Sequence, residues 1–94
     1  MTTPSDNTLT LSGEFTIATV LRFLADGKER VTQGDLSVDF SAVTSADSAA
    51  LAALFAWMRE ARQAGHHVFV HSLPEGVRSL AKLYGVETLL PASR

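Results

Sequence analysis

The sequence contains no cysteine, so neither a disulfide framework nor a thiolate for metal binding or catalysis can form. No apolar run approaches the roughly 18 residues that a membrane-spanning helix requires. The N-terminal segment MTTPSDNT is polar and lacks the basic start and apolar middle of a secretory signal. These absences predict a soluble protein that is not exported.

Charge is also scarce. Charged residues make up 19% of the 94-residue chain, and eight Lys and Arg against ten Asp and Glu give a net charge of −2. The basic residues are scattered through the chain, so the sequence gives no support for a nucleic-acid partner. Because a sparsely charged surface is often a covered surface, the composition favours a protein partner.

Hydrophobic periodicity predicts three strands that alternate with three helices. The expected strands are residues 8–12, 36–40 and 67–71, and the expected helices begin near Thr16, Asp47 and Pro74. Strands joined through helices need crossover connections, which are almost always right-handed. The predicted fold is therefore α/β, a small and mainly parallel sheet packed against amphipathic helices. Residues 1–7 are predicted to be a flexible tail, and residues 8–94 a single domain.

Each expected helix has an apolar stripe that we expect to face the sheet. The stripes are Ile17, Val20, Leu21 and Leu24 in the first helix, Leu51, Leu54, Phe55 and Met58 in the second, and Val77, Leu80, Ala81 and Tyr84 in the third. The second helix is the best defined, because Asp47 or Ser48 can cap its start and Gly65 its end.

Three neighbouring histidines are the first candidates for chemistry. Along a strand, His67 and His71 share a face while His66 points away, and no cysteine completes a zinc site. A metal site is therefore not predicted, and these histidines are interpreted as flanking a strand. Phosphate-binding loops of the G-x-x-x-x-G-K-S/T and G-x-G-x-x-G types are also absent from the sequence. No cofactor is predicted.

Ser48 has several interpretations. As a nucleophile it would need a nearby base, and only the fold could bring His71 close; the G-x-S-x-G elbow is missing. As a helix cap, Asp47 or Ser48 would satisfy a free backbone N–H, and replacement by alanine would cost about 1 kcal/mol. A helix start also favours an added phosphate. Catalysis is the least favoured of these interpretations.

The side of the second helix that lies opposite its core stripe is short-chained and nearly uncharged. It carries Ala49, Ala50, Ala53, Trp57 and Ala64. Alanine alone would be explained by its helix propensity. Small residues around one aromatic anchor, however, are typical of a protein-binding hot spot, so we expect a partner to dock on this face.

The order of elements and three segments together resemble STAS domains, small α/β modules of sulfate transporters and anti-sigma factor antagonists. The segments are LTLSGEF (residues 9–15), VDFS (38–41) and VTSADSAAL (43–51). The last is similar to the family's D-S-x-G-L signature, although Ala49 and Ala50 stand where glycine is frequent. The ending LAKLYGV (80–86) followed by LLP (89–91) is similar to MlaB-type proteins, STAS subunits of the Mla phospholipid-transport ABC complex.

The resemblance implies a non-catalytic cytoplasmic subunit that binds the ATPase subunit of the ABC transporter and supports assembly and activity of the complex. It would be peripheral to the inner membrane, attached through the complex, in a system that maintains outer-membrane lipid asymmetry. No small-molecule substrate is expected.

The resemblance also places Ser48 where the family has a Ser or Thr at the start of the second helix. In MlaB-like proteins this hydroxyl residue lies in the surface that meets the ATPase. The expected partner-binding residues are Thr44, Asp47, Ser48, Ala49, Ala50, Ala53 and Trp57. The alternative function is an anti-sigma factor antagonist, in which phosphorylation of Ser48 beside Asp47 would repel the partner.

Overall fold

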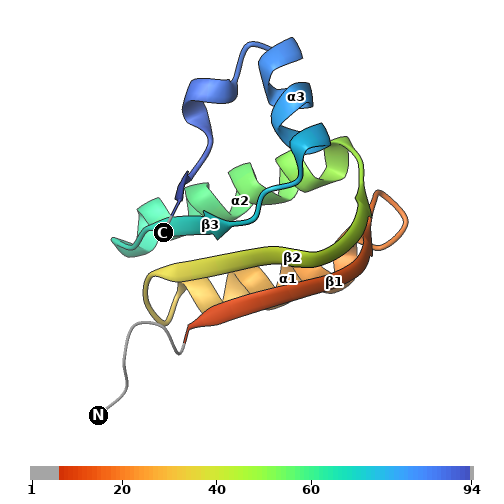
Figure 1. Cartoon of the computed structure of the whole chain (residues 1–94). Helices are drawn as coiled ribbons and strands as arrows, with labels where there is room; N and C mark the ends of the chain where they lie inside the picture. Colours follow the sequence, from red (N-terminus) through yellow and green to blue (C-terminus); the bar gives the residue numbers. More distant parts are fainter. Residues whose placement is uncertain (1–6, 94) are drawn as a thin grey trace.

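The computed structural model describes residues 7–93 and confirms the α/β prediction (Figure 1). The elements are β1 (Thr8–Phe15), α1 (Val20–Val31), β2 (Leu36–Ala46), α2 (Ser48–Ala64), β3 (Val68–His71), α3 (Glu75–Leu83), the 3-10 helix η2 (Glu87–Leu89) and β4 (Ala92–Ser93). The short strand β4 was not predicted. None of the helices in residues 7–93 is long and apolar enough to cross a membrane.

All strand pairs in the described part of the chain are parallel, in the order β1-β2-β3-β4. When each right-handed crossover steps in the same direction, the connecting helices lie on the same face of the sheet. Figure 1 shows α1 and α2 together behind the sheet. The strands accordingly bury Leu9, Leu11 and Val38 towards the helices and leave Thr10 and Ser12 exposed.

β1 and β2 are longer than predicted. The first strand was expected to stop at Gly13, but Gly13 adopts a φ of 75° beside a register shift, and the strand continues to Phe15. A glycine at an irregular strand position allows a local bend without ending the pairing. β2 likewise runs on to Ala46. Both strands therefore end beside the start of α2. The predicted partner-binding residues Asp47 and Ser48 thus lie where the paired strands β1 and β2 end.

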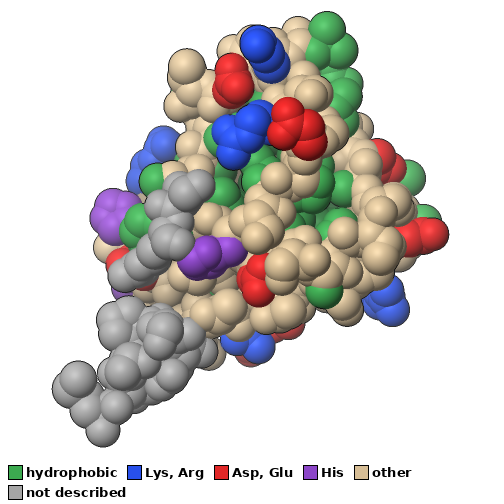
Figure 2. Space-filling model, in the orientation of Figure 1, with side chains coloured by type: hydrophobic (Ala, Val, Ile, Leu, Met, Phe, Trp, Pro, Cys, Tyr) green, Lys and Arg blue, Asp and Glu red, His purple; other side chains and the backbone are tan. Residues whose placement is uncertain are grey.

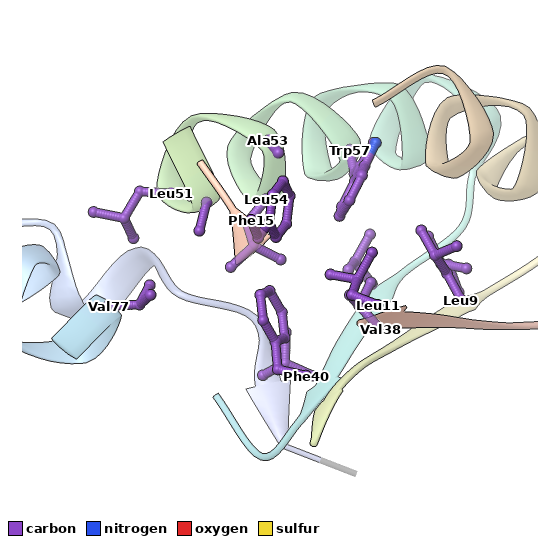
Figure 3. Packing of buried hydrophobic residues seen from close by; sticks show 14 of the residues in the cluster. Leu9, Leu11, Phe15, Val38, Phe40, Leu51, Ala53, Leu54, Trp57 and Val77 are labelled. Atoms are coloured by element: carbon purple, nitrogen blue, oxygen red, sulfur yellow. The ribbon is translucent and has the colours of Figure 1, made fainter. Parts of the chain in front are cut away.

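The core is centred on Phe15, whose ring lies 5.1 Å from Phe23, 5.9 Å from Phe40 and 6.3 Å from Trp57, centroid to centroid. Figure 3 shows Phe15 and Phe40 between α2 and the strands, with Leu54 above them. Edge-to-face and offset ring pairs at these distances add stability beyond the burial of their area. The prediction that Leu54 and Leu51 belong to the core is confirmed.

Trp57 joins α2 to α1. Its indole Nε1 donates a hydrogen bond to the carbonyl oxygen of Leu24 at 3.0 Å. Its ring packs directly on the buried Gly27, where an added Cβ would lie 2.7 Å from Cζ2 of the indole. No other residue type fits at position 27 without movement of the core, so the glycine is required by the tryptophan.

The predicted stripe of α1 is wrong in part. α1 begins at Val20 rather than near Thr16, and Ile17 and Leu21 are 78% and 76% exposed. Ile17 lies in the turn before the helix. Because α1 packs on Trp57 through Gly27, its buried side is centred there, and Leu21 lies about 120° around the helix from Gly27. The same error occurs in α3, where Tyr84 is exposed beyond the end of the helix.

The start of the domain also differs from the prediction. Asn7 was assigned to the tail, but its side-chain amide donates to the carbonyl oxygens of Arg30 and Asp35, each at 2.9 Å. Its own carbonyl accepts from the Ser37 N–H at 3.1 Å. Asn7 is therefore part of the folded domain. The rest of the predicted tail, residues 1–6, lies outside the described residues.

Candidate functional site

Asp47 organises the start of α2. One carboxylate oxygen accepts a hydrogen bond from the backbone N–H of Ala49 at 2.8 Å, which makes Asp47 the N-cap residue. The other oxygen accepts from the N–H of Ile17 at 3.2 Å. The predicted cap is confirmed for Asp47, and the same side chain also fixes the turn that precedes α1.

Ser48 is the first residue of α2 and is exposed. Thr44, near the end of β2, is exposed as well, and Asp47 between them is half-buried. The structure thus brings the two predicted hydroxyl residues to the surface where β2 leads into α2. Partner binding at Thr44, Asp47 and Ser48 stays a prediction.

The predicted docking face of α2 is wrong for four of its five members, whereas Ala64, the fifth, is exposed. Ala49, Ala50, Ala53 and Trp57 are all buried, Ala50 and Trp57 completely. The physical reason is that α2 is covered by the sheet on one side and by α1 on another. Small residues let α1 approach closely, and the indole fills the space farther along. Trp57→Ala is therefore a core truncation, with an expected cost of about 3–5 kcal/mol of folding stability, and cannot serve as a binding test.

An apolar hollow beside Ser48 was missed by the sequence reasoning. It lies between the N-terminal parts of α1 and α2 and has a volume of about 280 Å³. Its lining is entirely apolar: Ile17, Val20, Leu24, Ala49, Ala52, Ala53 and Ala56. We call this feature the α1–α2 hollow. The sequence does contain a signal for it, because alanines stand at positions i, i+3, i+4 and i+7 from Ala49. Residues at this spacing share one side of a helix, so that side of α2 carries only methyl groups.

The histidines do not form a site with Ser48. His71 lies opposite Asp39 in the β2–β3 register, and β2 continues for seven more residues to Ala46. At about 3.3 Å per residue, roughly 20 Å of β2 separates Asp39, the residue opposite His71, from the start of α2. The strand register therefore gives no support to His71 as the base that a Ser48 nucleophile would need. His66 instead hydrogen-bonds through Nδ1 to the carbonyl oxygen of Val31 at 2.7 Å.

Asp39 on β2 has a carboxyl group whose pKa is shifted by its neighbours. The pKa of its carboxyl group is below the ordinary 3.8, first because the backbone N–H of Ser41 donates to it, and then because the Ser41 side chain does so. The backbone bond is 2.9 Å long. Partial desolvation opposes this lowering, and the charge of His71 adds to it. Figure 2, in the orientation of Figure 1, shows acidic and basic side chains interspersed on this face, without a large patch of one sign. Among residues 7–93, no three or more His, Cys, Asp or Glu are grouped to hold a metal ion.

The model of one protein family, described as "Mlab, STAS domain", matches residues 2–91. This chain belongs to the family of MlaB-type STAS domains. The resemblance inferred from the segments around Asp47 and from the C-terminal stretch is thereby confirmed at the level of the family. No curated protein matches the sequence of this STAS domain.

Solved structures of anti-sigma factor antagonists share the fold of this STAS domain. The unphosphorylated antagonist SpoIIAA is 17% identical, with a TM-score of 0.71 over 93% of this chain and 78% of that one. A putative anti-sigma factor antagonist from Thermotoga maritima is 18% identical, with a TM-score of 0.75 over 95% and 80% of the two chains. The phosphorylated form of the Bacillus cell fate determinant SpoIIAA is 15% identical, with a TM-score of 0.68 over 99% and 88%.

Proposed function

We propose that this STAS domain is a non-catalytic subunit that binds the cytoplasmic ATPase of an Mla-type phospholipid-transport ABC complex. It supports assembly and activity of the complex and so contributes to outer-membrane lipid asymmetry. It is held at the inner membrane through the complex. The observation that carries the proposal is the match of the MlaB-type family model to residues 2–91.

The geometry at the start of α2 is consistent with docking rather than catalysis. The exposed Ser48 adjoins an apolar hollow whose lining offers no acid or base, and roughly 20 Å of β2 lies between Asp39, the residue opposite His71, and the start of α2. A serine nucleophile needs a base within hydrogen-bond distance. An exposed hydroxyl beside apolar surface is better suited to contact another protein, with the polar group at the rim of the interface.

Co-purification with the Mla-type ATPase of the same organism tests the proposal. Ser48→Arg places a long charged side chain at the proposed contact, and binding should fall at least tenfold. Ser79→Arg is the matched control, because Ser79 is an exposed helical serine on α3. The proposal is wrong if the wild-type chain does not bind this ATPase. Docking at Ser48 is wrong if the Ser48 and Ser79 variants bind equally well.

A second candidate is an anti-sigma factor antagonist switched by phosphorylation of Ser48. It is favoured by the shared fold of the solved antagonists and by the exposure of Ser48 at the start of a helix, where a phosphate is electrostatically tolerated. A phosphate would add about −1.5 to −2 charges beside Asp47. Intact mass of the protein purified from its own cells distinguishes the two candidates, since a phosphate on Ser48 supports the switch and its consistent absence contradicts it.

A further inference from the structure

We propose that the α1–α2 hollow receives about two turns of an amphipathic helix from the ATPase, and that it forms the apolar centre of an interface whose polar rim is the Thr44–Ser48 segment. This inference rests on the proposed function. It specifies which apolar surface of this domain contributes most of the binding free energy to the ATPase, and that the contacting segment of the ATPase is a helix.

The hollow exists because two parallel helices are held together at one end and lack side chains at the other. Trp57 packs on Gly27, and Lys28 approaches Glu60 to 4.0 Å, which closes the C-terminal end of the groove between α1 and α2. At the N-terminal end, Asp47 holds Ile17 by its backbone N–H. Between these two attachments α2 presents only alanines to α1, and methyl groups are too short to fill the space.

Apolar side chains around the hollow are left in solvent. Ile17, which lines it, is 78% exposed, and Leu21, which follows the lining residue Val20 in α1, is 76% exposed. Large exposed apolar residues that cluster around a concavity indicate an interaction site more strongly than isolated ones do. Filling the hollow would bury the exposed Ile17 side chain together with the alanines that line it.

The size of the hollow indicates one element of a larger interface. From Val20 to the closing Lys28, eight rises of 1.5 Å give a length of about 12 Å, or roughly two helical turns. A stable interface buries about 800 Å² per partner, far more than so short a groove offers. The hollow therefore cannot sustain a dimer of this chain alone. It adjoins the start of α2, because Ile17 in its lining donates its backbone N–H to Asp47, and the exposed Ser48 that follows can supply further contact area.

The chemistry of the walls favours a helix as the occupant. Both walls are helices whose backbone groups are bonded internally, so an extended segment would find no main-chain partners there. The lining carries no charge, and the nearby Lys28 and Glu60 neutralise one another. The matching surface is an uncharged helical face with apolar residues at positions i and i+3 or i+4.

Two pairs of variants test this inference by titration calorimetry with the purified Mla-type ATPase. Ala56→Leu fills the hollow, and Ala64→Leu makes the same change at an exposed position farther along α2. Ile17→Ser removes an apolar wall, and Leu83→Ser removes a leucine of similar exposure, 76%, on α3. We expect Ala56→Leu and Ile17→Ser to raise Kd about ten- to hundredfold, the effect of losing one buried aliphatic side chain. The two controls should leave Kd unchanged.

The outcomes separate this inference from the proposed function. If the wild-type chain binds the ATPase and all four variants bind equally well, the hollow is not part of the interface, while the proposed function stands. If the wild-type chain does not bind the ATPase, the proposed function fails and this inference with it. Thermal unfolding verifies that each variant is folded. If Ala56→Leu does not fold, Ile17→Ser still tests the inference, because Ile17 is exposed and its replacement leaves the core intact. Loss of self-association in Ala56→Leu by sedimentation, with ATPase binding intact, would identify a second copy as the occupant and overturn the inference.

Discussion

Replacement of Gly27 by alanine tests how α1 and α2 are held together. In an exposed helix this change is stabilising by about 1 kcal/mol, because alanine has the higher helix propensity. Here the new methyl group would lie 2.7 Å from Cζ2 of Trp57 and closer still to two other indole atoms. The ring is fully buried against Phe15 and cannot turn aside.

The expected loss follows from these contacts. Overpacking a core costs about 1–3 kcal/mol, and displacing the indole weakens its hydrogen bond to Leu24, worth about 1 kcal/mol. The higher helix propensity of alanine offsets about 1 kcal/mol of this loss. Gly27→Ala should therefore lower the free energy of unfolding by about 1–3 kcal/mol. For a domain of this size, that corresponds to a decrease in Tm of at least roughly 4 °C.

Urea unfolding followed by tryptophan fluorescence measures this effect, because Trp57 is the single tryptophan of the chain. Gly76→Ala on α3 is the matched control, since an added Cβ there meets nothing within 4 Å. It should be neutral or stabilising by up to about 1 kcal/mol. Equal stability of the two variants, with an unchanged native emission spectrum for Gly27→Ala, would refute the proposed contact between the helices.

Further predictions concern Asp47 and Asp39. Asp47→Ala removes acceptors for two backbone N–H groups and should destabilise by about 1–2 kcal/mol, whereas Ser48→Ala should stay within about 0.5 kcal/mol of wild type in urea unfolding. The reverse ranking would assign the cap to Ser48. The lowered pKa of Asp39 stabilises the native state above the unfolded-state value of about 3.9, and this contribution disappears as the pH falls through the lower native value. Carboxyl-carbon NMR titration should find the Asp39 pKa below 3.8, and a value at or above 3.8 contradicts the bonding from Ser41.

Local signals in the sequence were sufficient for the existence and order of β1 to β3 and α1 to α3, and for the start of α2. The alternation around Leu9 and Val38, the cap at Asp47 and the left-handed Gly65 act within a few residues, so they can be interpreted without knowledge of the fold. The end of β1 was misjudged at Gly13 because pairing with β2 outweighs the local preference of glycine to end a strand.

The site was predicted in part for a related reason. Helical periodicity shows which residues share a side of α2, but it does not show which neighbour covers that side. The side with Ala53 and Trp57 was expected to be free, and α1 covers it. Conversely, Ile17 and Leu21 were expected in the core, and the position of Gly27 against the indole turns Leu21 away from it.

The sequence by itself determined the alternation of strands and helices, the family and the hydroxyl at the start of α2, because these depend on short-range periodicity and on the order of residues. Only the tertiary structure decided that Trp57 is an internal contact between helices rather than an anchor for a partner. It also decided that a row of alanines would leave an open hollow beside Ser48. Burial and concavity arise from the packing of segments distant in sequence, and no local pattern specifies which of them meet.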